Sequence, residues 1–168
     1  MEQTVTTSTT KGLVIALILI VIALVTYFLD YNTSSTLQYV SYAIFIAGVI
    51  WSVNLYGKQI DHNSTFGNYF AHGFKVAALV TAIMIIYLII FVNLFPDIKD
   101  KGMEAVRKSM EAKGKMNSEQ ITQALTFTKK FFMVIIISST LIGYLVFGAI
   151  ASVIGAGITK KNPHTFDN

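Results

Sequence analysis

Four long apolar stretches alternate with polar segments along this 168-residue chain. They cover residues 12–29, 37–56, 70–95 and 131–158. The first stretch contains no charged side chain. As a helix, that stretch is roughly 27 Å long, which is close to the thickness of the hydrocarbon core of a bilayer. The pattern predicts an all-α fold, an integral membrane four-helix bundle that forms a single membrane domain over residues 1–168.

Local signals mark where these helices begin and end. Pro96 stops the third stretch, because a helix continued through proline loses a hydrogen bond and clashes with the preceding turn. Ser64 or Thr65 can cap the start of that helix. Residues 30–32 follow the first stretch in place of a small-residue cleavage site, so we expect an uncleaved helix and not a signal peptide.

The polar segment 97–130, between the third and fourth stretches, contains eight basic and five acidic residues. Met103, Val106 and Met110 recur at helical spacing, Gly114 interrupts, and Asn117 with Gln120 forms a capping-box pattern for a second helix. We expect an amphipathic helical hairpin whose second arm continues directly into the fourth stretch. Its apolar stripe has three possible uses: packing the two arms together, lying on lipid headgroups, or docking a partner.

Small residues indicate where the membrane helices pack, because close backbone approach is the main source of helix association in lipid. The fourth stretch has Gly148, Ser152 and Ala156 at intervals of four, and the third has Gly73 and Ala77 in a similar stripe. These two faces are expected to meet. Such patterns serve both packing within one chain and homo-oligomer formation.

Few polar side chains lie near the lipid: Asn54, His72, Lys75 and Asn93. His72 and Lys75 are three residues apart and therefore share a helix face. Ionisable groups at membrane depth are candidates for function, yet both precede the strictly apolar run and can act as interface anchors instead. Trp51 and Tyr56 are typical of an interfacial aromatic belt.

Composition narrows the class further. Only 13% of the residues are charged and 54% are hydrophobic, so water is not the main solvent of this chain. The net charge of +4 is spread over loops and tails, which favours anionic lipid headgroups over nucleic acid as the partner. The chain has no cysteine and none of the common nucleotide-binding or hydrolase motifs. We expect no cofactor, no metal site and no enzymatic activity.

Orientation follows from basic residues near the ends of the spans. Lys11 precedes the first span and Lys58 follows the second, whereas the turn between these spans has neither lysine nor arginine. Both termini are therefore expected in the cytoplasm, with segment 97–130 on the opposite side.

Two segments resemble a known family. Residues 65–75, TFGNYFAHGFK, enter the third span, and SEQI at 118–121 followed by KKFF at 129–132 leads into the fourth. Over essentially the whole chain, these segments resemble domain of unknown function 4199, a family of small bacterial inner-membrane proteins. The resemblance implies a four-helix membrane fold and a bacterial origin. It implies no catalytic or binding residues, because the family has none assigned.

Two classes of function remain open. One is a non-catalytic scaffold or envelope-associated interaction protein of the inner membrane, acting through segment 97–130 on a membrane-protein partner. The other is a small oligomeric transporter or channel subunit, which a polar stripe through the bilayer centre would favour. Thr81, Asn54 and Asn93 do not clearly form such a stripe, so the first class is preferred.

Overall fold

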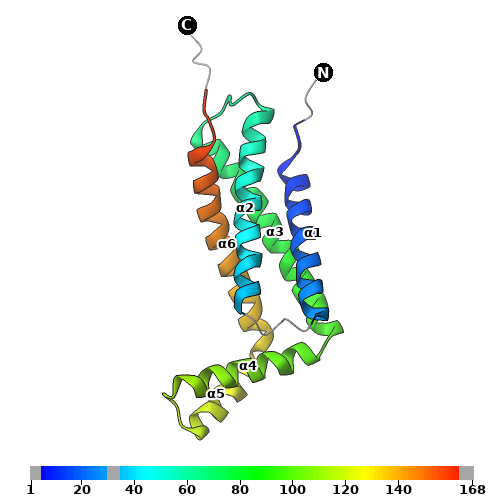
Figure 1. Ribbon diagram of the computed structural model, residues 1–168, viewed down its shortest axis with the longest axis vertical. Helices are drawn as coiled ribbons and strands as arrows, with labels where there is room; N and C mark the ends of the chain where they lie inside the picture. Colours follow the sequence, from blue (N-terminus) through cyan, green and yellow to red (C-terminus); the bar gives the residue numbers. More distant parts are fainter. Residues whose placement is uncertain (1–4, 30–34, 163–168) are drawn as a thin grey trace. The chain divides into compact units, whose positions relative to one another are not determined.

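A computed structural model describes residues 5–29 and 35–162, with the backbone alone for residues 35–38, and these residues form six helices (Figure 1). The four long ones are α1 (Ser8–Phe28), α2 (Ser35–Gln59), α3 (Phe66–Leu94) and α6 (Phe132–Ile158). Each contains a segment long and apolar enough to cross a membrane, which confirms the predicted all-α fold with four candidate spans. Two shorter helices, α4 (Asp97–Lys113) and α5 (Ser118–Lys130), lie between the last two spans.

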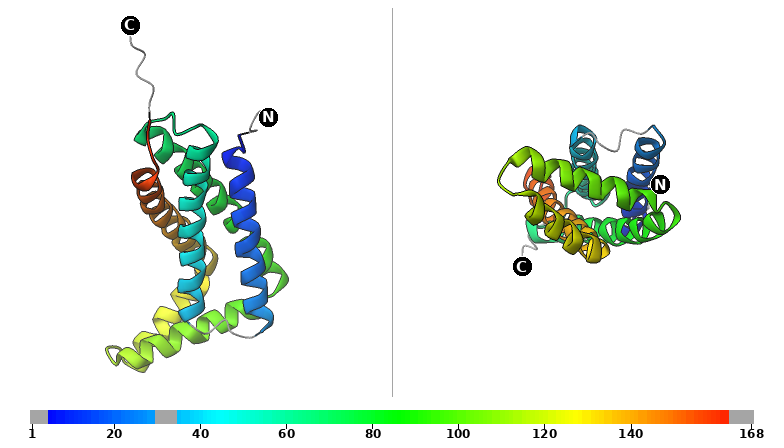
Figure 2. Two further views of the ribbon diagram at one scale, coloured as in Figure 1. Left: turned by 45° about the horizontal axis from the view of Figure 1, so that its top comes forward. Right: turned by 90° about the horizontal axis from the view of Figure 1, so that it is seen from below.

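The chain divides into two compact units, which α3 and α6 both run through. The first, called here the bundle unit, comprises Met1–Met84 and Ile142–Asn168. The second, the hairpin unit, comprises Ile85–Leu141 and includes α4 and α5. Within the bundle unit, α1, α2 and parts of α3 and α6 lie side by side in all views (Figures 1 and 2).

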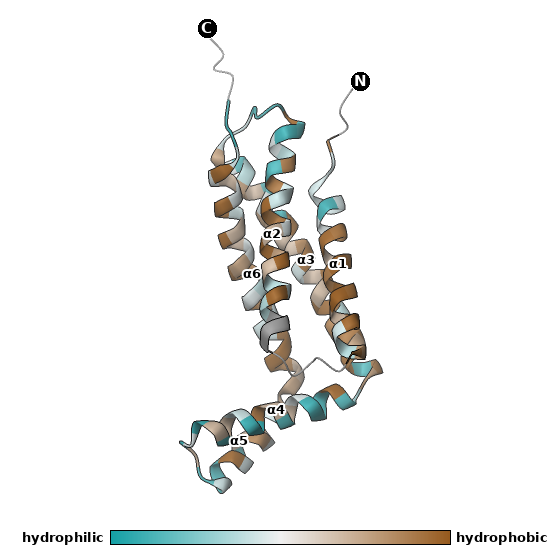
Figure 3. Cartoon of the chain, in the orientation of Figure 1, coloured by the Kyte–Doolittle hydropathy of each residue, from teal (hydrophilic) through white to brown (hydrophobic). Residues whose placement is uncertain are grey.

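Helix α1 buries one stripe and leaves its other side to lipid. The outward residues are as apolar as the buried ones: Leu13 and Leu17 are 52% and 65% exposed. Most of α1 after its first turn is brown in Figure 3, and a helix that is apolar all round gives no hydropathy signal for its buried face. The buried stripe comprises Lys11, Gly12, Ile15, Ala16 and Leu19.

Helices α3 and α6 approach closely at small residues. A Cβ atom added at Gly73 would lie 2.8 Å from the Oγ atom of Ser152, and one added at Gly148 would lie 2.5 Å from the Cβ atom of Ala77. The structure thus brings the two predicted small-residue faces together within one chain. Further along α6, Ala156 is fully buried and packs in a cluster with Val53 and Tyr69.

The hairpin unit contains the predicted helical hairpin. Helix α4 ends at Gly114, whose φ of 60° is a left-handed conformation that glycine adopts without strain. Helix α5 begins with the predicted capping box: the side chain of Asn117 accepts from the Gln120 backbone N–H, and the Gln120 side chain accepts from the Asn117 backbone N–H. Ile121 is buried and Met103, Val106 and Met110 of α4 are half-buried, which favours packing of the two arms against each other.

The junction between α5 and α6 differs from our expectation. We expected one continuous helix through Lys129 and Lys130, but α5 ends at Lys130 and α6 begins at Phe132. Phe131 has φ of −105° and ψ of 16°, outside the α-helical region. The Phe132 ring packs on α4, where it lies under the Lys99 ammonium group and against Gly102. Neither proline nor glycine in the sequence signals this break.

Ion pairs four residues apart cover the outer face of α4. They join Asp97 to Lys101, Glu104 to Lys108 and Arg107 to Glu111. The Lys108 ammonium donates a hydrogen bond to the Glu104 carboxylate and so lowers the pKa of Glu104, while the same bond raises the pKa of Lys108. Because these pairs are exposed, they favour the helix only weakly and mainly keep this face polar.

The contact between Gly148 and Ala77 generates a prediction about stability. Replacing Gly148 by alanine should lower the free energy of unfolding in mixed micelles by about 1 to 3 kcal/mol, because the new methyl group overlaps Ala77. The matched control is Gly157→Ala on the same helix, where an added Cβ meets nothing within 4 Å. That variant should be neutral or slightly more stable, since alanine favours helix. Equal stability of the two variants would contradict a tight seam between α3 and α6.

Candidate functional site

Polar and aromatic side chains gather at the end of the bundle unit where α1 and α3 begin and α2 and α6 end. Lys11 of α1 contacts α2, Tyr56 of α2 contacts α3, and His62, which follows α2, contacts Lys160, which follows α6. Helix ends bring this chemistry together because antiparallel neighbours place the start of one helix beside the end of the next. We call Lys11, Tyr56, Gln59 and His72 the lysine–aromatic cluster.

Lys11 is the centre of this cluster. Lys11 is only 2% exposed, and its ammonium group donates a hydrogen bond of 3.1 Å to the Oε1 atom of Gln59. The same group lies 5.5 Å from the centroid of the Tyr56 ring, a cation–π distance. Among the described residues, no carboxylate forms an ion pair with Lys11. A buried cation is therefore held by an amide and a ring in place of an anion.

Tyr56 joins Lys11 to His72. The Tyr56 and His72 rings are stacked with centroids 4.2 Å apart and planes 4° apart. The Nε2 atom of His72 is buried and has no hydrogen-bond partner among the described residues. The Tyr69 ring packs edge-on against the Tyr56 ring, with the two centroids 6.0 Å apart. Tyr56 is thus a packing residue of the cluster, in contrast to the lipid-facing belt expected from the sequence.

The connection from α2 to α3 is fixed against the segment after α6. Helix α2 ends in a Schellman pattern, in which the backbone N–H of His62 donates to the Gly57 carbonyl at 2.8 Å and that of Asp61 to the Lys58 carbonyl at 3.3 Å. Asp61 and His62 have φ values of 51° and 60°, left-handed positions that glycine usually fills. The Lys160 carbonyl accepts from Tyr69 at 3.3 Å and lies 3.1 Å from the His62 Nδ1 atom.

The four predicted polar residues do not form one site. His72 is half-buried in the cluster, Lys75 is exposed, and Asn54 is half-buried on α2. Asn93 belongs to the hairpin unit, where its side chain donates to the Ile89 carbonyl at 2.7 Å. Within the described part of the chain, no three histidine, aspartate or glutamate side chains are grouped so that they could hold a metal ion.

Sequence reasoning missed Lys11 and Gln59 as members of the cluster. Lys11 served there only as a marker of orientation, although it lies four residues before Ile15 and eight before Leu19, on the same helix face. The sequence shows this spacing, but because α1 is apolar on all faces, nothing in the sequence indicates that this face is the buried one. Gln59 carried no signal, because a polar residue at a helix end is ordinary.

Four serine and threonine hydroxyl groups buried in the bundle unit donate within their own helices or to the turn that precedes them. Each donates to a backbone carbonyl three or four residues earlier, at 2.7 or 2.8 Å, so its proton is already used. The four are Ser52, Thr81, Ser152 and Thr159. Such bonds are the usual way for serine and threonine to occupy a membrane helix without an unpaired polar group.

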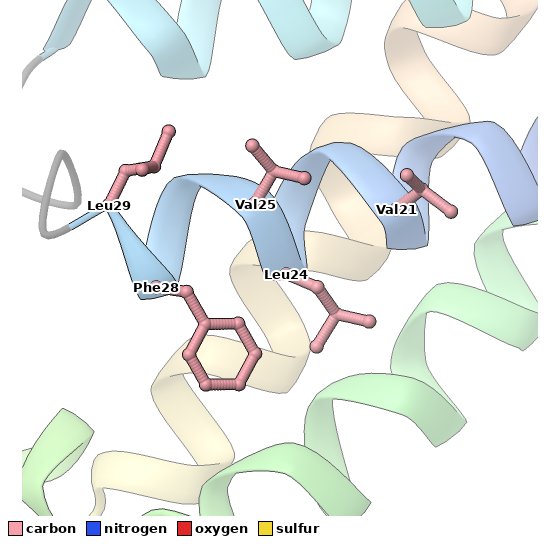
Figure 4. A pocket seen from close by; sticks show the side chains of 5 residues that line it. All are labelled: Val21, Leu24, Val25, Phe28 and Leu29. Atoms are coloured by element: carbon pink, nitrogen blue, oxygen red, sulfur yellow. The ribbon is translucent and has the colours of Figure 1, made fainter.

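An open hollow lies along the last turns of α1 and is lined by apolar side chains (Figure 4). Its lining offers no hydrogen-bonding side chain, so hydrocarbon suits it and a polar ligand does not. A lipid acyl chain has this chemistry. The lining residues are Val21, Leu24, Val25, Phe28 and Leu29.

The contact between Lys11 and Gln59 generates a second prediction. Gln59→Leu should lower the free energy of unfolding by about 1 to 3 kcal/mol, because it leaves the buried ammonium without its acceptor. Lys11→Met should cost less, since half-buried Gln59 can turn to water. In the double variant the two losses should therefore be clearly less than additive. Additive losses would show that the hydrogen bond contributes nothing.

Comparison with known proteins gives a family and no function. The family described as protein of unknown function (DUF4199) matches residues 10–161, which include all six helices except the first two residues of α1. Neither the curated proteins nor the solved structures contain a match to this chain. The family match covers most of the chain and agrees with the resemblance noted in the sequence. On this basis, the chain belongs to the DUF4199 family.

Proposed function

We propose that this protein is a non-catalytic scaffold of the bacterial inner membrane, which presents the α4–α5 hairpin to other envelope components. The main support is the state of the buried hydroxyls. Ser52, Thr81, Ser152 and Thr159 each donate to a nearby backbone carbonyl, so these four buried groups offer no free hydroxyl proton along the described bundle interior. Tight contacts between α3 and α6 also leave little room for a solute.

The hairpin is the part of the chain best suited to interaction. The apolar faces of its two arms pack against each other, and the ion-paired outer face of α4 stays exposed. This face presents charges of both signs, and electrostatic complementarity is a general way for such a surface to select a partner. Catalysis has no support in these residues, because no nucleophile, paired carboxylates or metal ligands converge within the described chain.

A cytoplasmic location of both termini is part of the proposal. Lys11, Lys58, Lys160 and Lys161 belong to the same end of the bundle unit, where contacts join the ends of α1, α2 and α6. Asp61 is the only acidic residue in segments 57–75 and 159–162. An excess of lysine at one end is the usual signature of the cytoplasmic side.

Cysteine labelling tests this orientation, because the chain has no native cysteine. In cells with a permeabilised outer envelope, Ser109→Cys on the exposed face of α4 should react with an impermeant maleimide. Asn162→Cys, which is equally exposed, should react only after the inner membrane is disrupted. Labelling of Asn162→Cys alone in intact inner membranes would invert the orientation.

The alternative, a transporter or channel subunit, draws on the lysine–aromatic cluster. A buried ammonium beside a histidine nitrogen without a partner could carry charge. Under the scaffold proposal, liposomes containing the parent protein should be as tight to protons and ions as empty liposomes when a pH or voltage gradient is applied. A robust flux in the parent that Lys11→Met with His72→Gln abolishes would overturn the scaffold proposal.

A further inference from the structure

A pair of exposed aromatic rings lies where the hairpin joins α6. Phe127 and Phe131 are 62% and 36% exposed, and their ring centroids are 4.7 Å apart. The ammonium group of Lys130 lies 5.5 Å from the Phe131 ring centroid. We call Phe127, Lys130 and Phe131 the junction patch. Two large exposed rings in mutual contact, with a cation beside them, suit a partner that is apolar and anionic at once.

The junction patch is not part of the hairpin core. The buried position of α5 is Ile121, and the half-buried Leu125 follows it at i+4 on the same face. Phe127 lies two residues after Leu125 and therefore points about 160° away from it around the helix. The packing of α4 against α5 thus leaves this side of α5 uncovered, although it carries the largest side chains of the helix.

Position along the chain identifies what lies beside the patch. Phe131 immediately precedes α6, a candidate span of 27 residues that is roughly 40 Å long and exceeds the hydrocarbon core of about 30 Å. Such a helix is tilted or begins within the headgroup layer. Phe127 is only five residues before α6, so it is within roughly 8 Å of that layer along the helix. The bilayer is the one surface that the patch always adjoins.

We propose that the junction patch is a membrane anchor, which inserts the rings of Phe127 and Phe131 below the headgroups of the leaflet on the hairpin side. Lys129 and Lys130, the basic residues of the last turn of α5, then lie at the level of anionic lipid phosphates. Phenylalanine beside lysine is the composition of interfacial segments, in which rings enter the acyl boundary and ammonium groups stay with the phosphates. The anchor fixes the α5 end of the hairpin to the membrane, whichever protein the hairpin serves.

Tryptophan fluorescence tests the anchor, because the chain has a single tryptophan, Trp51, which can be replaced by phenylalanine. In that background, full-length Phe127→Trp is placed in vesicles of phosphatidylcholine and phosphatidylglycerol whose acyl chains are brominated near the headgroup. The expected result is blue-shifted emission and a clear loss of intensity by quenching. The matched control, Thr126→Trp, is exposed on a different face at the same level of α5 and should be quenched much less.

Each other outcome overturns the anchor. Red-shifted emission of Phe127→Trp without quenching would place the ring in water, and equal quenching of the two variants would show that no face of α5 is selected. Blue-shifted emission without quenching would indicate a protein contact, such as a second copy of this chain. If Phe127→Trp does not fold, Phe131→Trp is measured in the same lipids, and absence of quenching there would overturn the anchor.

The charge of the anchor is tested separately. Replacing both Lys129 and Lys130 by glutamine should reduce the quenching of Phe127→Trp. Unchanged quenching would show that anionic lipid does not contribute to the anchor.

Discussion

Close approach of helix backbones at Gly73 and Gly148 is the constraint on which the bundle depends. Lipid tails are as apolar as leucine, so burying more leucine would not hold these helices together. What distinguishes the assembled state is contact between atoms that only glycine allows, with Ser152 and Ala77 filling the space on the opposite helix. The serine hydroxyl can enter this dry seam because it donates to the Gly148 carbonyl of its own helix.

The seam also explains the position of the lysine–aromatic cluster. With α3 drawn against α6, the first turns of α3 hold His72 beside Tyr56 of α2, and the stacked rings form the surface over which the Lys11 ammonium lies. The cluster therefore contributes polar contacts to α1, a helix whose remaining buried residues are apolar or glycine. Apolar contacts alone specify neither depth nor rotation in lipid, whereas a hydrogen bond from Lys11 to Gln59 specifies both.

Much of this architecture is readable from the sequence, because its causes are local. Length and apolarity define the four spans, Pro96 and Gly114 end helices, and Asn117 with Gln120 begins one. Spacing alone picks out the small residues that the structure places between α3 and α6. The sequence does not reveal two features that have no local signal. The break at Phe131 lies beside the packing of Phe132 on α4, and the left-handed turn after α2 uses Asp61 and His62 where glycine would have been recognisable.

The burial of Lys11 has a consequence for biogenesis. During synthesis α1 emerges before α2 and α3, so the Lys11 ammonium then lacks its contacts with Gln59 and Tyr56. In the assembled bundle only 2% of the Lys11 residue remains exposed. The exposure of this ammonium group therefore distinguishes α1 alone from α1 in the assembled bundle.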